Sequence, residues 1–396
     1  MTDKLHVQIA LVGGSPTPVY QGIVHIKPRQ VILACSRQTR LLADSIKEQL
    51  QLFAAEEMSG GYTDKDVFIY ELSDNDLSKM YDIAETIVSS LSPEVQLSLN
   101  LTSGMKLWSL IFDEVFGAKR PDCLRFTIGQ DGTLFNLTDK TFGEKVAFDM
   151  YAQFKLLGHH LDASTPLQEY TEEDEKVLNK VWSINKTGTG FKYFAFHSIT
   201  AKFLDNYQKA NQNILMRKDF GVTSNKPDSD LSWVAESRTF ECRLGYSAYT
   251  FSSEHVEHIV LNTGWFEYYV AHLVGKIYQK EKVWLNCLFK DANNQAKNEI
   301  DIIADMGSRL LFVECKTQVY ESTDVDKFRT AVRNYGGLGS IPLFVTLHEM
   351  KDLAREKCVD SKITTFYINN PAYRNEAAVV EALRVLLKDL SQKWNV

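Results

Sequence analysis

The chain has 396 residues, 44% of them hydrophobic and 11% aromatic, which at roughly 100–200 residues per domain predicts two or three packed domains. It contains no run of about 18 apolar residues and begins without a secretory pattern, so we expect a cytoplasmic protein that contacts no membrane. The net charge of −7 argues against nonspecific coating of DNA, but it is compatible with a nuclease whose substrate contacts form one local patch. The cysteines form no CxxC pair, which indicates reduced thiols rather than a zinc site or disulfides.

Residues 1–140 alternate short apolar runs with amphipathic stretches. Because strands that alternate with helices form parallel sheets, this region predicts a Rossmann-like domain, which we place at residues 1–150. A hairpin is expected to close it. The expected strands are His6–Val12, Val31–Cys35, Val67–Leu72, Val95–Leu101, Leu124–Ile128 and Thr133–Leu137, and the expected helices are Arg40–Leu50, Leu77–Leu91 and Leu107–Phe116.

Residues 151–245 are the least informative part of the chain, and we expect a linker and connecting region there. The stretch 160–175 is polar and acidic, with Pro166 and the run Glu172–Glu175, which is typical of a linker. Residues 211–230 are rich in polar residues with a Gly and a Pro, which indicates an exposed loop.

Residues 246–396 predict a second α/β domain. It is expected to begin with one long helix, followed by strands with helices between them. The expected helices are Glu254–Gln279, Asp324–Tyr335 and Glu376–Leu390, and the expected strands are Val283–Phe289, Asn298–Asp305, Leu310–Lys316, Ile341–Thr346 and Ile363–Ile368.

Glu267 interrupts the apolar stripe of the long expected helix. The flanking stripe residues, Val260 and Val270 among them, recur at steps of three and four, which keeps one helical face turned inward. A buried carboxylate is unfavourable unless it is paired or binds a cation. Glu267 is therefore either a functional carboxylate or the partner of a nearby basic residue.

Two neighbouring strands carry charged residues that alternate with apolar ones. Asp301 shares a strand face with Glu299, and Glu314 shares one with Lys316. A short turn joins the strands, so Asp301 and Glu314 are expected to converge on a hard cation such as Mg²⁺ or Mn²⁺. Such a metal suits phosphodiester hydrolysis, with Lys316 offsetting developing charge. The alternative is a ladder of surface salt bridges.

These residues resemble the PD-(D/E)xK restriction-endonuclease-like superfamily, although the Pro of that pattern is absent. The matching segments are Gly264–Glu267, Asn298–Asp301 and Glu314–Lys316. The resemblance implies that Glu267, Asp301 and Glu314 bind the metal and that Lys316 is the catalytic lysine. It leaves Glu299 as an auxiliary ligand or a polar neighbour.

Three polar loops follow strands of the first domain. Since open parallel sheets bind ligands at the carboxyl ends of their strands, and helix N-termini favour phosphate, these loops are candidate ligand contacts. The alternative is ordinary helix capping by Ser and Thr. The candidate residues are Ser15, Pro16, Thr17, Ser36, Gln38, Thr39, Thr102, Ser103, Gly104, Met105 and Lys106.

The segment Asn100–Lys106 resembles a ligand motif of CARF domains, and Ser36–Thr39 resembles the first ligand loop of that family. Ser103 and Met105 replace the Gly and Thr that are commoner in the motif. A CARF domain followed by this nuclease is similar to the Card/Can-type ancillary nucleases of type III CRISPR systems.

The resemblance implies a homodimer that binds a cyclic oligoadenylate, most often cyclic tetra-adenylate, across its two-fold axis. It also implies ligand-activated cleavage of single-stranded DNA, RNA or supercoiled DNA in antiviral defence, by a shift in population towards an active dimer. Two alternatives stay open. One is a ligand-responsive nucleic-acid-binding regulator with an inactive nuclease fold, and the other is a ring nuclease that degrades the cyclic ligand.

Overall fold

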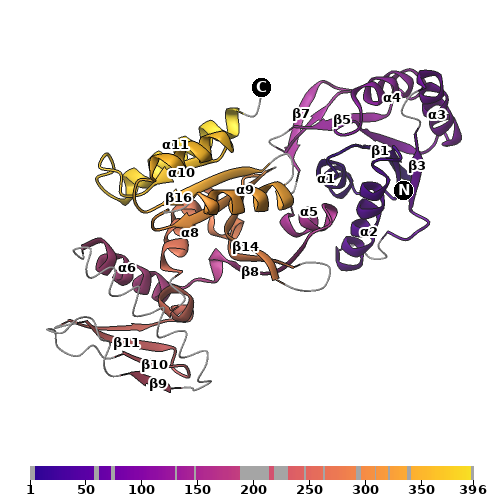
Figure 1. The fold of residues 1–396 in the computed structure, drawn as a ribbon. Coiled ribbons are helices and arrows are strands. Elements are labelled where there is room, and N and C mark those ends of the chain that lie inside the picture. Colours follow the sequence, from indigo (N-terminus) through magenta and orange to yellow (C-terminus); the bar gives the residue numbers. More distant parts are fainter. Residues whose placement is uncertain are drawn as a thin grey trace.

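A computed structural model gives the architecture of the chain. It describes residues 5–57, 62–72, 76–129, 132–146, 149–187, 214–217, 231–244, 247–261, 264–290, 296–307, 309–319, 322–336 and 340–393. The molecule is elongated, with an N-terminal domain at one end, a second α/β domain in the middle and a small antiparallel sheet at the other end (Figure 1).

The N-terminal domain is built on a mixed sheet of order β3-β2-β1-β4-β5-β6-β7 within the described residues, with its first five strands parallel. This strand order is the doubly wound arrangement of Rossmann folds. The strands are β1 (His6–Val12), β2 (Gln30–Cys35), β3 (Val67–Glu71), β4 (Gln96–Asn100), β5 (Leu124–Ile128), β6 (Thr133–Asn136) and β7 (Thr141–Lys145).

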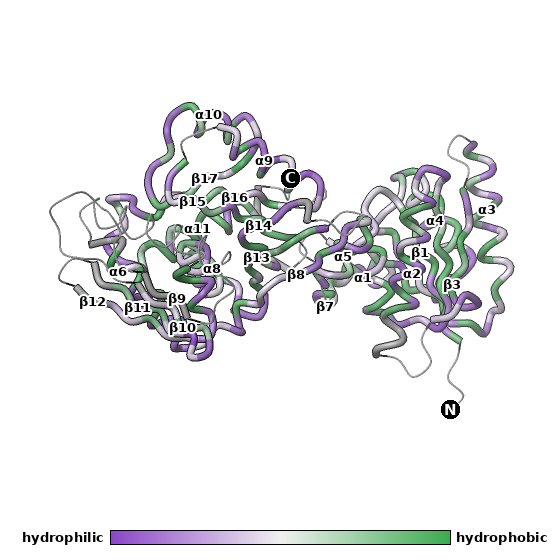
Figure 2. Tube along the Cα trace, turned by 60° about the horizontal axis from the view of Figure 1, so that its bottom comes forward, coloured by the Kyte–Doolittle hydropathy of each residue, from purple (hydrophilic) through white to green (hydrophobic). Residues whose placement is uncertain are grey.

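Helices cover both faces of this sheet, and β1 is buried on both sides. Val7, Ile9 and Leu11 pack towards α3 (Leu77–Ser90) and α4 (Lys106–Lys119), whereas Ala10 and Val12 pack towards α1 (Thr17–Ile26) and α2 (Arg40–Glu57). The apolar strands at the centre of both large sheets stand out in Figure 2. The predicted Rossmann-like α/β domain is thereby confirmed.

Helix α1 was not predicted. Its N-terminal segment reads as a loop because of Gly14, Pro16 and Pro18, yet a proline is well placed in the first turn of a helix, where no backbone N–H donor is needed. The buried residues Val19 and Ile23 then hold the helix against the sheet.

The second α/β domain has a mixed sheet of order β17-β16-β15-β14-β13-β8 in the part of the chain that is described. Strands β15, β16 and β17 are parallel, and β14, β13 and β8 continue the sheet as antiparallel neighbours. The strands are β8 (His160–Pro166), β13 (Val283–Lys290), β14 (Ala296–Asp305), β15 (Leu310–Lys316), β16 (Ile341–Thr346) and β17 (Thr364–Tyr367).

The two faces of this sheet carry separate cores. One core packs under α8 (Trp265–Tyr278) and α11 (Glu376–Lys393), and the other under α9 (Thr323–Tyr335) and α10 (Asp352–Asp360). The long helix expected from Glu254 to Gln279 is wrong in detail. A π-helical turn at Glu257–Leu261 comes before α8, which begins at Trp265.

The linker expected at residues 160–175 is also wrong. Residues 160–166 form β8, which pairs antiparallel with β13 at the edge of the second sheet, and polar residues are common in edge strands. The acidic run Glu172–Glu175 is the first turn of α6 (Glu172–Thr187), where negative charge suits the helix dipole. Thr171 and Asp174 form a reciprocal capping box at its start.

The remaining elements of this region form a small antiparallel sheet of order β12-β11-β10-β9 within the described residues. It lies beside α6 at the far end of the molecule (Figure 1). Its strands are β9 (Ile214–Arg217), β10 (Leu231–Val234), β11 (Thr239–Leu244) and β12 (Ser247–Ser252). The exposed loop expected at residues 211–230 lies outside the described residues, apart from β9.

One short helix belongs to both α/β domains. On α5 (Met150–Leu156), Ala152 and Leu156 pack into the core of the N-terminal domain. Met150 and Phe154 pack into the core of the second domain, where Phe154 meets the Phe289 ring edge-on at 4.9 Å between centroids. The two domains are therefore joined through packed side chains as well as through the backbone. No helix in the described ranges is both long and apolar enough to span a bilayer.

The packing of α5 predicts that Phe154→Ala lowers the free energy of unfolding by about 3–5 kcal/mol, because it removes a fully buried ring. Urea unfolding followed by tryptophan fluorescence measures this change. Lys155→Ala alters the exposed side of the same helix and serves as the control. Equal stability of the two variants would contradict a bridging role for Phe154.

Candidate nuclease centre and ligand loops

The predicted nuclease residues gather where β14 and β15 separate. The ladder between these strands runs from Asp305↔Leu310 to Ile302↔Val313. Beyond that pair, the Asp301 carboxylate accepts the backbone N–H of Cys315 at 2.7 Å. The Asp301 side chain thus pairs with the backbone N–H of Cys315, which the backbone of β14 no longer reaches. This hydrogen bond fixes the carboxylate where the two strands separate.

Lys316 forms ion pairs with both strand carboxylates. Its Nζ lies 2.6 Å from Glu314 Oε1 and 3.6 Å from Asp301 Oδ2. Glu314 and Lys316 project from the same face of β15, as their alternation predicts. The structure therefore brings Asp301, Glu314 and Lys316 together.

Burial makes these charges chemically unusual. The side chains of Asp301 and Glu314 are 13% and 14% exposed. Desolvation raises the pKa of both carboxyls above their usual values, helped for Asp301 by repulsion from Glu314, while Lys316 opposes the rise. Burial would lower the pKa of the Lys316 ammonium, but the carboxylates keep it above its ordinary value.

Glu267 joins this cluster from helix α8. It lies in the first turn of the helix, where the helix dipole favours a negative charge. Repulsion from Glu267 contributes to the raised pKa of both Asp301 and Glu314, which places it within electrostatic reach of them. Its Oε2 also lies 3.7 Å from Nε2 of His258.

The donor set suits a hard cation. Two carboxylates pair with the Lys316 ammonium and a third, Glu267, lies within electrostatic reach of them, so the cluster keeps net negative charge when all are ionised. Oxygen ligands are those that Mg²⁺ and Mn²⁺ prefer. No three His, Cys, Asp or Glu side chains in the described part of the chain already stand in a metal-binding arrangement. The Lys316 ammonium pairs with the two strand carboxylates instead.

Glu299 does not share this environment. It precedes Asp301 by two residues on β14, but its side chain is exposed. Strand alternation alone therefore does not bring it into the buried cluster.

The predicted ligand loops of the N-terminal domain converge on one another. The Ser103 hydroxyl accepts the N–H of Gly13 at 3.0 Å and donates to the carbonyl of Ser15 at 3.1 Å. The Thr39 hydroxyl donates to the carbonyl of Val12 at 2.9 Å, which ties the second loop to the first. Gly13 has no room for a Cβ, because it would lie 2.4 Å from the backbone nitrogen of Gly104.

Several hydroxyls in these loops form hydrogen bonds to other residues of the same domain and so stabilise the loops. Thr102 Oγ1 donates to Asn100 and accepts the N–H of Ile128, and Ser36 exchanges hydrogen bonds with Thr39. This is the capping alternative raised by the sequence. Pro16 and Ser36 are buried, Thr17, Thr39, Thr102, Ser103 and Gly104 are half-buried, and Ser15, Gln38, Met105 and Lys106 are exposed.

Sequence reasoning missed His258 and Tyr170. The hydroxyl of Tyr170 lies 2.8 Å from Nδ1 of His258, although the two residues are 88 positions apart. The only local signal was the Thr171–Asp174 capping pattern, which marks the start of a helix directly after Tyr170.

Residues 254–365 match the family model of the Card1-like endonuclease domain. No curated protein matches the sequence. Among solved structures, protein VC1899 from Vibrio cholerae is similar, with a TM-score of 0.69 and 12% identity over 98% of this chain and 97% of that one.

Two further solved structures share the architecture. Can2 from Sulfobacillus thermosulfidooxidans, in complex with cyclic tetra-adenylate, has a TM-score of 0.62 and 14% identity over 99% of both chains. A type III CRISPR defence DNA nuclease activated by cyclic oligoadenylate has a TM-score of 0.53 and 16% identity over 89% of this chain and 46% of that one. The predicted resemblance to Card/Can-type nucleases and the predicted fold class are confirmed.

The raised pKa of Asp301 predicts that a neutral side chain at this position makes the folded protein more stable. Replacing Asp301 with Asn keeps an acceptor for the Cys315 N–H and removes a charge that burial disfavours. In metal-free buffer at pH 8, Asp301→Asn is expected to unfold at higher urea than the wild type.

The direction of this stability change follows from the raised pKa of Asp301. The folded wild type holds a proton that the unfolded chain has lost, so its stability falls as pH rises from the usual Asp range through the folded value. The advantage of Asp301→Asn should therefore vanish in acid. Asp360→Asn, at an exposed carboxylate, is the control. A stabilisation that stays constant with pH would contradict this explanation.

Proposed function

Because the chain has a Card/Can-type fold and carries a Card1-like endonuclease domain, we propose that it is a metal-dependent nuclease activated by a cyclic oligoadenylate. The observation that carries the proposal is the pairing of Lys316 with the largely buried carboxylates Asp301 and Glu314, joined by Glu267 from α8. Charged groups that are removed from water destabilise the folded state, and such groups are typical of functional sites.

Glu267, Asp301 and Glu314 would hold Mn²⁺ or Mg²⁺. When bound, the cation supplies Lewis acidity towards the scissile phosphate and the attacking water. Lys316, with 36% of its side chain exposed, can donate a hydrogen bond to a phosphate oxygen and offset charge that develops there. Asp301 stays oriented by its bond to the Cys315 N–H.

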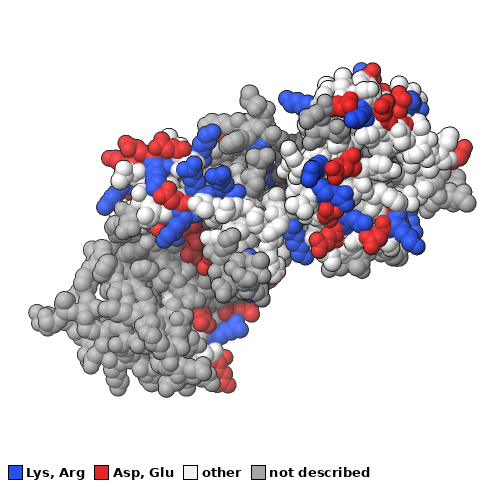
Figure 3. All heavy atoms as spheres, turned by 45° about the vertical axis from the view of Figure 1, so that its right-hand side comes forward, with Lys and Arg blue, Asp and Glu red and all other residues white. Residues whose placement is uncertain are grey.

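The substrates we propose are single-stranded DNA, RNA or supercoiled DNA. The similar type III CRISPR protein is described as a DNA nuclease, which supports a nucleic-acid substrate. Figure 3 shows acidic and basic side chains interspersed over the N-terminal domain, so that face offers no broad basic surface for a duplex. Cutting would take place in the second domain.

The proposed activator is cyclic tetra-adenylate, held by the converging loops at the ends of β1, β2 and β4. The Can2 structure contains this ligand in a similar fold, which supports the choice. Exposed Ser15, Gln38, Met105 and Lys106 are free to contact it from the loop surface. The amino ends of α1 and α4 add backbone N–H donors for phosphate.

We further propose a homodimer with the ligand across its two-fold axis. The apolar side chains of Leu41, Leu107 and Leu110 are 79%, 44% and 68% exposed near the loops, which supports an interface there. A symmetric cyclic ligand fits an interface in which both subunits present the same surface. Activation would follow from tighter binding of the ligand to the active dimer geometry.

The proposal predicts cleavage of labelled single-stranded DNA or RNA, or nicking of supercoiled plasmid, only when both Mn²⁺ and cyclic tetra-adenylate are present. Glu314→Ala should abolish cleavage, and Lys316→Ala should slow it by about 10²–10³-fold, because each removes a charged group from the cluster. Glu349→Ala changes an exposed carboxylate elsewhere and is the control.

Full cutting by Glu314→Ala would overturn the proposal. Binding of duplex DNA without any change in its length or topology would favour the regulator with an inactive nuclease fold. Chromatography of the ligand after a long incubation tests the ring-nuclease alternative, and an unchanged ligand removes it.

The ligand loops predict a separate effect of Lys106→Ala. It should raise the cyclic tetra-adenylate concentration for half-maximal cleavage by about 10–100-fold, since a charge-assisted hydrogen bond is worth about 1.5–3 kcal/mol. Cleavage at saturating ligand should be unchanged. Lys119→Ala, at the other end of the same helix, should leave the activation curve where it is. Identical curves for wild type and Lys106→Ala would remove Lys106 from the ligand site.

A further inference from the structure

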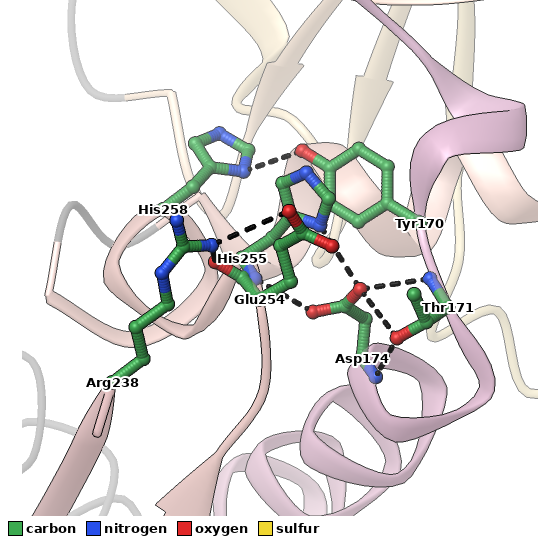
Figure 4. Close-up of polar contacts among 7 residues, drawn as sticks. All are labelled: Tyr170, Thr171, Asp174, Arg238, Glu254, His255 and His258. Atoms are coloured by element: carbon green, nitrogen blue, oxygen red, sulfur yellow. Dashed lines mark hydrogen bonds and ion pairs between the residues drawn. The ribbon is translucent and has the colours of Figure 1, made fainter. Parts of the chain in front are cut away.

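A chain of polar contacts leads from the start of α6 to the candidate metal ligand Glu267. The hydroxyl of Tyr170 lies 2.8 Å from Nδ1 of His258, and Nε2 of the same ring lies 3.7 Å from Glu267 Oε2. Figure 4 shows the Tyr170 hydroxyl directed at the His258 ring. His258 therefore lies between a buried tyrosine and a carboxylate of the cluster, and each of its nitrogens faces one of them.

The backbone leaves a space that the His258 ring fills. A Cβ on Gly264 would lie 2.3 Å from Nε2 of His258, so only glycine allows the ring to sit there. The N–H of Gly264 also donates to the carbonyl of His258 at 3.0 Å. Gly264 precedes the first turn of α8, which carries Glu267, so the ring is packed against the start of that helix.

Tyr170 is itself held rigidly. Its ring stacks on Tyr268 at 4.2 Å and on His255 at 4.3 Å between centroids. His255 is fixed in turn by Asp174, which is fully buried and accepts the His255 N–H at 2.9 Å and lies 3.0 Å from its Nδ1 (Figure 4). Tyr170 therefore supports both His258 and Tyr268, the neighbour of Glu267 in sequence.

The two contacts of His258 select one tautomer of its ring. A carboxylate accepts hydrogen bonds, and Glu267 Oε2 lies 3.7 Å from Nε2, so the tautomer that fits this environment carries its proton on Nε2. In that tautomer Nδ1 is the acceptor, which fits a hydrogen bond from the Tyr170 hydroxyl 2.8 Å away. Burial raises the pKa of Tyr170 well above its ordinary value, which keeps that hydroxyl protonated and able to donate.

We propose that His258 is a positioning residue for the metal ligand Glu267, and that Tyr170 orients the His258 ring so that Nε2–H faces the Glu267 carboxylate. This inference rests on the proposed nuclease function. Groups that orient a metal ligand in this way commonly affect metal affinity about 10–100-fold. Neither residue contacts the nucleic acid or the metal in this proposal, and both act through Glu267.

The test measures Mn²⁺ binding to the full-length protein by electron paramagnetic resonance, together with cleavage as a function of substrate concentration. Tyr170→Phe keeps the stacking and removes only the hydroxyl, and it should weaken Mn²⁺ binding about 10–100-fold. The thermal midpoint and the KM for nucleic acid should stay close to those of the wild type. Tyr268→Phe removes a hydroxyl from the same stack and should bind Mn²⁺ as the wild type does.

Substitutions of His258 provide a second test of the same proposal. His258→Ala should weaken Mn²⁺ binding as Tyr170→Phe does, whereas His258→Gln retains an N–H donor of similar reach and should recover part of the affinity. If Tyr170 acts through His258, adding Tyr170→Phe to His258→Ala should have no further effect.

Unchanged Mn²⁺ affinity in Tyr170→Phe, or fully additive losses in the double variant, would overturn the positioning role. Those results leave the proposed function intact if the wild type binds Mn²⁺ and cuts. A wild type that neither binds Mn²⁺ nor cuts with the cyclic ligand present overturns the proposed function itself. The two failures are therefore distinguishable.

Discussion

The pairing of Lys316 with two buried carboxylates is the interaction on which the rest of the centre depends. Asp301 and Glu314 lie where two strands separate, and their charges are costly in an apolar interior unless a cation compensates. The ammonium provides that compensation from within the chain, and the Cys315 N–H adds a fixed donor. The two carboxylates are therefore held in place by groups of the chain itself.

Much of the fold and of the candidate cluster of charged residues could be predicted from the sequence, because both depend on local periodicity. The apolar runs of β1, β15 and β16 have the same bounds in the structure as in the prediction. The alternation in β15 placed Glu314 and Lys316 on one face, and the interruption of an apolar helical stripe singled out Glu267.

The parts that escaped prediction depend on contacts between distant segments. β8 is polar and becomes a strand only because β13 pairs with it, far along the chain. The packing of the His258 ring against Gly264, just before α8, is a contact that no periodic pattern indicates. The Tyr170–His258 contact has no periodic signature, because it joins two segments that lie 88 positions apart in the sequence.

The two-sided helix α5 has a consequence for how a signal could travel between the domains. A flexible tether would let the N-terminal domain turn without disturbing its neighbour. Here any turn must either carry Phe154 with it or withdraw that ring from the aromatic packing around Phe289. A movement that keeps Phe154 packed is therefore restricted to the small sliding displacements that closely packed helices tolerate. Since β8 follows α5 and leads to Tyr170, such a displacement would pass along this segment towards the Tyr170–His258 contact and Glu267.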